Sequence, residues 1–550
     1  MLTNPKMPLD ILQGEAEKTD GEEIQASIFA VAKEFSDFMA STLGPQSLHK
    51  LIVEQDRWAY IITSDGETIL QRFDLMQFKA KHPVARLMVE LSKTQDYDLG
   101  DGTTSTVVLA GNLLREAEKL ISIGLHPNTV AAGYKFALKR ALIHARELAS
   151  PATSEDLFRV AMTALDTKYA TVSKEPLSRM VVDAVMKVSD GGRTRADPKD
   201  IHVVKRKGTG VFNSTLFHGF IIEKSMLNES MPERMEAAKI AVIDLPLTVK
   251  RYAGIFGDNP LYEIEIKDIE GLKIHREEEK GILMRMFSKL KNVGADCVIS
   301  RKLIDPRVGR WMADAGIIGV QGIPSRDDLK RLSRAVGANI ISDLDTISSN
   351  DLGSANLVEV KKYPNKETLI FIENEAAGTV TILLRGGAHH VLSEVERAMK
   401  DAVHSTSSAL NDGGILPAGG ACEVYIAARL KKDALALGDK RQLAVEAFAT
   451  ALEGIPRTLV RNSGLDQIKL IMDLRREQNE NGSNYGFDAN SRQIRDMKEA
   501  GIIEPLSIKE SIYKGAFETA DILLRSESII TGMVFESRIE SELKKKNGEK

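Results

Sequence analysis

The spacing of apolar positions divides the chain into helix-rich and strand-rich stretches. From about residue 25 to 150, apolar residues recur at the intervals of amphipathic helices that bury one face. Two alternating apolar runs at 50–53 and 59–63 interrupt this pattern on either side of a polar turn, and they predict a β-hairpin. This part of the chain is therefore expected to be mainly helical.

A different pattern occupies residues 215 to 345, where short β-type runs alternate with helical segments, as is typical of an α/β domain. The predicted elements of this region are strands at 239–244, 296–300 and 338–342 and a helix at 326–336, and another strand is predicted beyond it at 379–384. Helical spacing then returns from His390 to Leu410 and continues to about residue 475. The helical domain is therefore expected to be split in sequence around an inserted domain.

Composition narrows the class of protein. A chain of 550 residues suggests three or four domains, at about 150 residues each. With 43% apolar residues, 28% charged residues and a formal net charge of −4, a globular protein without a basic bias is expected, and nucleic acid is not an expected partner. Cys297 and Cys422 lack metal-ligand spacing, which favours a reducing, cytoplasmic location. The sequence contains neither a membrane-span pattern nor a signal peptide, so no membrane partner is predicted.

The segment Gly100-Asp-Gly-Thr-Thr-Ser105 carries the most specific chemical signal. It precedes an apolar helical run at 106–118, and small residues at a helix start leave backbone N–H groups available to an anion. Two threonines are expected to cap this helix. Asp101 would repel phosphate unless a cation lay between them, so the loop predicts a magnesium–nucleotide complex. A glycine-rich turn that merely starts a core helix is the alternative, because the Walker lysine is missing.

Three further segments are weaker candidates. Asp65-Gly66 follows the predicted hairpin, and Asp412-Gly413 closes the long helix, where a carboxylate is disfavoured by the helix dipole. Asp-Gly is also a common turn dipeptide, so a simple turn accounts equally well for either pair alone. The small-residue loop 417–423 precedes another helix and would allow close approach by a ligand.

Nine short motifs in this order resemble those of group II chaperonin subunits, the family of archaeal thermosomes and the eukaryotic cytosolic chaperonin. They are Leu43-Gly-Pro45, Thr63 to Leu70, Gln95-Asp96 with Gly100 to Ser105, Thr379 to Gly387, Asn411-Asp-Gly413, Gly419-Gly-Ala421 with Glu423, Pro456 to Leu459, Asn462 to Asp466, and Glu504-Pro-Leu506. The resemblance covers nearly the whole chain.

The resemblance implies a multidomain α and α/β chaperonin fold. A helical equatorial ATP-binding domain would comprise residues 1–146 and 403–550, and an α/β intermediate domain 147–214 and 366–402. An α/β apical domain would comprise residues 215–365, with a helical lid protrusion at about 249–287. The apolar stripe near the end of that protrusion, from Ile282 to Leu290, has the helical spacing of a core face rather than of a client site.

The same resemblance assigns residues to an ATP/ADP and magnesium site. Asp101 would hold magnesium, Asp65 and Asp412 would align and deprotonate the attacking water, and Lys168 would sense the γ-phosphate. The remaining cofactor-binding positions lie around the phosphates or near the sugar and base: Leu43, Gly44, Pro45, Gly66, Gly102, Thr103, Thr104, Ser105, Gly413, Gly419, Gly420, Asp488 and Glu504.

Several positions depart from the family pattern. Ser47 and His49 replace a usual glycine and aspartate, Ala418 replaces the first of three glycines, and Thr167 and Tyr169 flank Lys168 in place of glycines. They suggest a divergent thermosome paralogue. The expected function is an ATP-dependent subunit of a double ring, with identical or paralogous subunits and non-native polypeptides as partners. A structural or regulatory subunit with weak turnover is the alternative, and an unrelated ATP-using enzyme lacks a recognisable substrate site.

Overall fold

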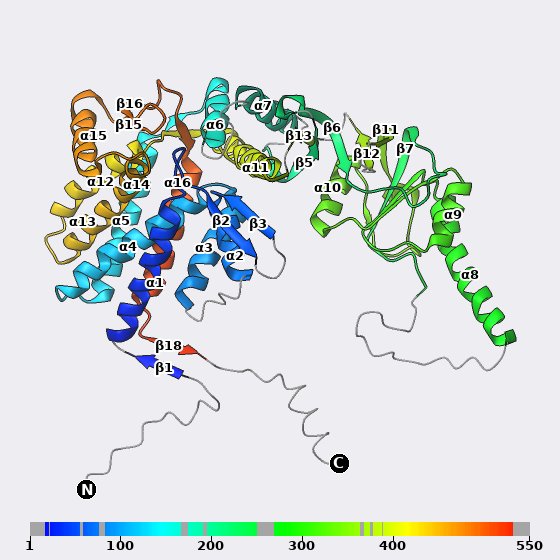
Figure 1. The fold of residues 1–550 in the computed structure, drawn as a ribbon, viewed down its shortest axis with the longest axis horizontal. Helices are drawn as coiled ribbons and strands as arrows, with labels where there is room; N and C mark the ends of the chain where they lie inside the picture. The colour runs from blue at the N-terminus through cyan, green and yellow to red at the C-terminus, as the bar shows by residue number, and fades with distance from the viewer. Residues whose placement is uncertain are drawn as a thin grey trace, which may run out of the picture. The chain divides into compact units, whose positions relative to one another are not determined.

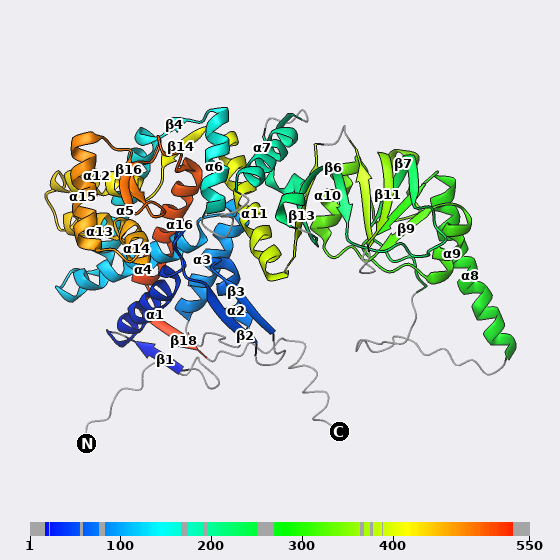
Figure 2. The ribbon, with the colours of Figure 1, turned by 45° about the horizontal axis from the view of Figure 1, so that its top comes forward.

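The structure is a computed structural model that describes residues 17–20, 22–54, 59–75, 83–166, 174–190, 195–208, 210–249, 269–363, 368–374, 378–387 and 389–531. It contains two compact units (Figures 1 and 2). The first comprises residues 1–171 and 404–550, and the second comprises residues 172–403. Two segments distant in sequence thus build the first unit, as the split helical pattern predicts. The finer three-domain boundaries stay a prediction.

The first unit is mainly helical. Its helices are α1 (Glu22–Ala40), α2 (Gly66–Leu75), α3 (Pro83–Leu99), α4 (Thr103–Ser122), α5 (Pro127–Leu148), α6 (Ser154–Asp166), α12 (Ala421–Leu435), α13 (Arg441–Leu452), α14 (Gly454–Asn462), α15 (Gln467–Asn481) and α16 (Leu506–Leu524), with the end of α11 (His389–Asp412). Its strands are β1 (Glu17–Asp20), β2 (Lys50–Glu54), β3 (Ala59–Thr63), β4 (Ser150–Pro151), β14 (Gly414–Pro417), β15 (Tyr485–Asp488), β16 (Gln493–Asp496), β17 (Ile503–Pro505) and β18 (Ser528–Thr531).

Helix α4 lies at the centre of this unit, packed against α1, α3, α13 and α16. Apolar residues on several of its sides are buried, among them Val107, Leu109 and Leu113. A Cβ on Gly111 would collide with the side chain of Ser36, whose hydroxyl donates to the Val108 carbonyl at 3.2 Å. The glycine thus lets α1 and α4 approach closely. The predicted helix after residue 105 is confirmed.

Small sheets complete the first unit. Strands β2 and β3 pair antiparallel, which confirms the predicted hairpin. Strand β1 pairs antiparallel with β18, so segments from near the two ends of the described chain lie side by side. In the sheet β17-β14-β4, Leu416 lies opposite Glu504 and Ile415 opposite Ser150. That sheet brings the strand leading into the 417–423 loop beside Glu504.

The second unit is α/β. Its strands are β5 (Ile201–Lys207), β6 (Thr215–Ile222), β7 (Arg234–Ile243), β8 (Cys297–Ser300), β9 (Ile318–Gln321), β10 (Ile340–Ile341), β11 (Gly353–Lys362), β12 (Thr368–Glu373) and β13 (Val380–Gly386). They form one mixed sheet in the order β5-β13-β6-β12-β11-β7-β8-β9, with β10 beside β7. The helices are α7 (Lys174–Asp190), α8 (Ile269–Asn292), α9 (Pro306–Asp314), α10 (Arg326–Val336) and the start of α11, with short 3-10 turns at Pro198–Asp200, Val211–Asn213 and Ser349–Asp351.

Side chains that alternate along a strand pack against helices on opposite faces of the sheet. Along β7, Ile240 and Val242 pack with α10 on one face, whereas Ala241 and Ile243 pack with α8 and α9 on the other. Helix α10 spans the predicted range, and a strand lies at each of the predicted positions 239–244, 296–300, 338–342 and 379–384, although β7 begins five residues earlier and β10 is only Ile340–Ile341. This region is therefore α/β as predicted.

The apolar stripe of α8 belongs to the core. Leu283, Phe287 and Leu290 are buried in one cluster, and the Phe287 ring lies 6.1 Å from the Trp311 ring. This confirms the core interpretation of the stripe. About half of the predicted protrusion, residues 250–268, lies outside the described residues, as do the tail at 532–550 and the Thr167–Tyr169 segment.

His202 on β5 is a titratable ring packed into the sheet unit. It stacks on Phe220 with ring centroids 4.8 Å apart. Burial, followed by the Arg331 cation, lowers its pKa from 6.5 to about 4. The ring is therefore neutral at pH 7.

We expect this depressed pKa to make folding pH-dependent. Because the unfolded chain binds the proton near pH 6.5 and the folded chain near pH 4, stability is full above pH 6.5 and falls as the pH drops towards 4. The loss amounts to about 3 kcal/mol, for a pKa lowered by about 2.5 at about 1.4 kcal/mol per pKa unit. The His202→Phe variant keeps an aromatic ring on Phe220, so it should lack this component when unfolding is followed between pH 7 and 4. His218→Gln, at an exposed position of β6, is the control, and an equal acid loss in parent and His202→Phe would contradict the prediction.

Candidate functional site

The loop before α4 is held by a network around Asp101. The Asp101 Oδ1 atom accepts from the Gly102 amide at 2.6 Å, and Oδ2 accepts from the Ser405 hydroxyl at 2.8 Å. The Gln95 amide donates to the Asp101 carbonyl at 2.8 Å and accepts from the Ser511 hydroxyl at 2.8 Å. Parts of α3, α11 and α16 thus fix the backbone and the carboxylate of the predicted metal ligand.

The first turn of α4 differs from the expectation of threonine capping. Gly102, in the left-handed conformation at φ 80°, occupies the N-cap, and in the described part of the chain no side chain caps the helix. Thr103, Thr104 and Ser105 instead lie inside the first turn. The capping prediction is wrong because the turn needs a positive φ at the N-cap, which favours glycine there. The amides of this turn keep their capacity to bind an anion.

The Asp65-Gly66 turn packs directly on that first turn. A Cβ on Gly66 would lie 2.6 Å from the Thr104 hydroxyl oxygen and 3.0 Å from that of Thr103, so glycine permits the contact. The buried Asp65 carboxylate accepts from the Thr68 amide at 2.9 Å and from its hydroxyl at 2.7 Å, which caps α2. Asp65 therefore has a structural role beside the catalytic one that the resemblance implies.

Asp412 is the last residue of α11 and is exposed. Within the described residues its carboxylate makes no hydrogen bond or ion pair, and no contact joins it to Asp65 or Asp101. It follows Ser405 by seven residues, so both project from the same face of α11, about 10 Å apart along the axis. Gly413, at φ 66°, then turns the chain, and its carbonyl accepts from the Ala152 amide at 2.8 Å.

Sequence reasoning passed over a second carboxylate of α11. Asp401 is 7% exposed and precedes Ser405 by four residues, one helical turn. Asp401, Ser405 and Asp412 therefore form one stripe along the helix. The spacing of four and seven residues between Asp401, Ser405 and Asp412, which places them on one face of a helix, was the signal that could have found Asp401.

The Leu43-Gly44-Pro45 turn is supported by α14. Gly44 has φ 84° and faces Leu459 where a Cβ would stand. The Asn462 side chain donates to the carbonyls of Ala40 and Leu43 at 2.9 and 2.8 Å. These hydrogen bonds join the end of α1 and the Leu43-Gly44-Pro45 motif to the motif that begins at Asn462.

The second glycine loop starts α12 in the same way as Gly102 starts α4. Gly420 is the N-cap at φ 76°, and no side-chain cap is present among the described residues. Gly419, at φ 61°, accepts from the Phe487 amide at 2.9 Å, and a Cβ there would lie 2.6 Å from the Phe487 carbonyl oxygen. This contact places Asp488, the next residue, beside the loop. The Asp488 carboxylate accepts from the Asn490 amide at 2.9 Å.

Asn490 joins three of the predicted segments. Its side-chain oxygen accepts from the Gln46 amide at 3.3 Å, and its nitrogen donates to the Asp166 carboxylate at 2.6 Å. The Gly44 turn, the Asp488 turn and the end of α6 are thus bridged by one side chain. Lys168 follows α6 by two residues and lies outside the described residues, so its predicted contact with phosphate stays a prediction.

Glu504 takes part in a buried ion network. Lys509 contacts Glu504 at 2.9 Å and Glu423 at 2.7 Å, and the Tyr513 hydroxyl donates to Glu423 at 3.2 Å. Burial raises the pKa of Glu504, the Lys509 cation opposes the rise, and the negative charges of Glu423 and Asp101 add to it. Glu504 thus lies within electrostatic reach of Asp101.

These residues fit a magnesium–phosphate ligand. Two helix starts offer uncapped amides, Asp65 and Asp101 offer carboxylates, and the Gly66 contact is too close for any side chain. The described residues hold no group of three or more His, Cys, Asp and Glu side chains that could bind a metal by themselves. A cation here would rest mainly on Asp101 and on phosphate oxygens, as magnesium commonly does.

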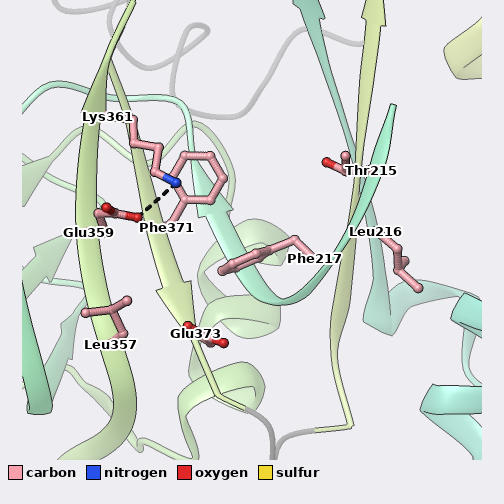
Figure 3. Close-up of a pocket in the computed structure, with 8 residues that line it drawn as sticks. All are labelled: Thr215, Leu216, Phe217, Leu357, Glu359, Lys361, Phe371 and Glu373. Carbon is pink, nitrogen blue, oxygen red and sulfur yellow. Dashed lines mark ion pairs between the residues drawn. The ribbon is translucent and has the colours of Figure 1, made fainter. Parts of the chain in front are cut away.

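A separate pocket of about 200 Å³ lies on the sheet of the second unit (Figure 3). Phe217 and Phe371 meet edge to face in it, 5.3 Å apart, and Lys361 pairs with Glu359 at 2.9 Å on its rim. Glu373 completes the polar rim. None of the predicted nucleotide-site residues lines it.

None of the described helices combines the length and apolar content that a membrane crossing requires. Residues 35–533 match the TCP-1/cpn60 chaperonin family. A thermosome alpha subunit from Archaeoglobus fulgidus is 38% identical over 536 residues, covering 96% of each chain. A thermosome beta subunit from Methanothermobacter thermautotrophicus is 36% identical over 526 residues, covering 96% of this chain and 95% of the relative. A thermosome subunit from Pyrococcus abyssi is 37% identical over 541 residues, covering 97% and 96%.

These similarities extend over nearly the full length of each pair of chains, and they confirm the resemblance carried by the nine motifs and the multidomain α and α/β fold class. The chain therefore belongs to the TCP-1/cpn60 chaperonin family, as an ATP-dependent group II chaperonin subunit.

Proposed function

We propose that this chaperonin subunit binds and hydrolyses Mg-ATP at a site built around Asp101 and the start of α4. The observation that carries the proposal is the pair of glycine-started helices, α4 and α12, whose first turns no described side chain caps. Such amides, with the helix dipole, favour phosphate. The Asp65-Gly66 turn packs on one of them, so carboxylates and amides are available to the same ligand.

Each residue role follows the family motif that it matches. Magnesium, when bound, supplies positive charge between carboxylate and phosphate oxygens. Asp101 holds this cation, and Asp65 and Asp412 orient and deprotonate water, a task for carboxylates that are ionised at neutral pH. Lys168 senses the γ-phosphate. The phosphates are bound by Gly44 and Pro45 with Gly102, Thr103, Thr104 and Ser105. Gly419 and Gly420 lie near the sugar, and Asp488 and Glu504 near the ribose and base. Leu43, Gly66 and Gly413 are further nucleotide-binding positions.

Hydrolysis drives the folding of non-native polypeptides in a cytoplasmic double ring of identical or paralogous subunits. The relatives that match nearly the whole chain are named thermosome subunits, which supports an assembly of this type. Residues 215–365, whose described part includes the α8 and α9 layer, would form the client-binding domain with its lid.

Asparagine substitution at both Asp65 and Asp412 should reduce single-turnover hydrolysis by about 100-fold or more, the scale of lost general-base assistance. Asparagine is preferable to alanine at Asp65 because it still accepts from Thr68 and caps α2. Calorimetry should find ATP affinity within a few-fold of the parent.

Two comparison variants make this test specific. Asp401→Asn tests the other carboxylate of the α11 stripe. If it abolishes turnover while Asp412→Asn retains the parent rate, the water-orienting role belongs to Asp401. If the parent itself fails to hydrolyse ATP within complete rings, the subunit is a structural or regulatory member with weak turnover.

The full chain, alone or mixed with paralogous subunits, should form stacked double rings in negative-stain images with Mg-ATP. The β1–β18 ribbon and the β2–β3 hairpin are short two-stranded sheets that leave strand edges available for pairing. A chain that stays monomeric under both conditions would contradict the ring assembly.

A further inference from the structure

We infer that Ser405 is a positioning residue for the predicted cation ligand Asp101 and couples α11 to the nucleotide loop. The inference rests on the proposed function and adds one more residue to that site. The Ser405 side chain is 1% exposed, and its hydroxyl donates to Asp101 Oδ2 at 2.8 Å across a separation of 304 residues.

Ser405, like Ser36 and Ser511, is a helical serine whose hydroxyl donates to another element rather than within its own helix. A buried serine or threonine in a helix commonly donates to the carbonyl four residues earlier. Helical residues that do so here are Thr106, Thr163, Thr450 and Thr458. Ser405 instead donates to a carboxylate on another element. The hydrogen bond of the buried Ser405 hydroxyl therefore depends on the position of the Asp101 carboxylate.

The loop before α4 and helix α11 also approach each other closely at Gly100. Gly100, at φ 66°, faces the His404 ring, and a Cβ there would lie within 2.8 Å of several His404 atoms. A side chain at position 100 would separate the loop from α11. The close contact of Gly100 with His404 does not depend on the hydrogen bond from Ser405. Both interactions join the loop before α4 to helix α11.

The hydrogen bonds leave Asp101 oriented but able to accept further ligands. Each carboxylate oxygen has capacity for about two partners. Oδ1 uses one for the Gly102 amide and Oδ2 uses one for Ser405. A carboxylate held in this way is already ordered before a cation arrives, and removal of such a supporting hydrogen bond typically weakens metal binding by about 10- to 100-fold. Ser405 therefore raises cation affinity without touching the cation's partner phosphate.

The test compares cation binding in full-length variants. Mn²⁺ is titrated by electron paramagnetic resonance in the presence of ADP, and ADP affinity is measured separately in EDTA. Ser405→Ala should weaken Mn²⁺ binding by about 10- to 100-fold and leave ADP affinity in EDTA within about twofold. Ser405→Thr, which keeps the hydroxyl, should bind Mn²⁺ more tightly than Ser405→Ala.

Ser407→Ala is the matched control. It removes a hydroxyl from the same helix whose oxygen is buried and has no hydrogen-bond partner within the described residues, so Mn²⁺ affinity should equal that of the parent. The Asp101→Asn variant distinguishes failure of the cation assignment from failure of the inference about Ser405. If Asp101→Asn binds Mn²⁺ like the parent, the cation assignment in the proposed function fails. If Asp101→Asn weakens binding but Ser405→Ala matches Ser407→Ala, the role of Ser405 is overturned.

Discussion

The burial of α4 is the constraint on which the rest of the helical unit depends. Its apolar side chains contact α1, α3, α13 and α16, so lateral displacement of the helix would expose core from four neighbours. Because the helix axis is fixed by this packing, its N-terminus is fixed as well. The amides that follow Gly102 therefore point to one place, and the Asp65-Gly66 turn and Ser405 of α11 contact the loop there.

Local patterns predicted those parts of the fold that depend on local chemistry. The β2–β3 hairpin and α10 were found because alternation and amphipathic spacing are visible within a dozen residues. The sequence also contains a local signal for the glycines with positive φ that start α4 and α12, since glycine directly before an apolar helix favours such a turn. The threonine caps failed for a related reason, because a favourable capping residue does not reveal whether the backbone places it before the helix or inside its first turn.

Contacts between distant segments could not be predicted in this way. Asn490 bridges Gln46 and Asp166, Lys509 pairs with Glu423, and Ser405 donates to Asp101, each across a large separation in sequence. Nothing in a serine, lysine or asparagine inside a helix or turn distinguishes it from a solvated residue until the fold supplies its partner. The continuous sheet from β5 to β9 is a further example, because strand order arises from packing rather than from strand sequence.

The charges around the predicted site explain why a cation belongs to its chemistry. Asp65, Asp101, Glu423 and Glu504 supply carboxylates, while Lys509 is the cation paired with two of them. Each helix start offers about 0.3 to 1 kcal/mol of attraction to an anion, which is small beside the repulsion between a polyphosphate and carboxylates in a partly buried site. Burial is the main cause of the raised pKa of Glu504, and the negative charges of Glu423 and Asp101 add to it against the opposing Lys509 cation. In the proposed site, a divalent cation on Asp101 would offset the repulsion between these carboxylates and the phosphates of a nucleotide.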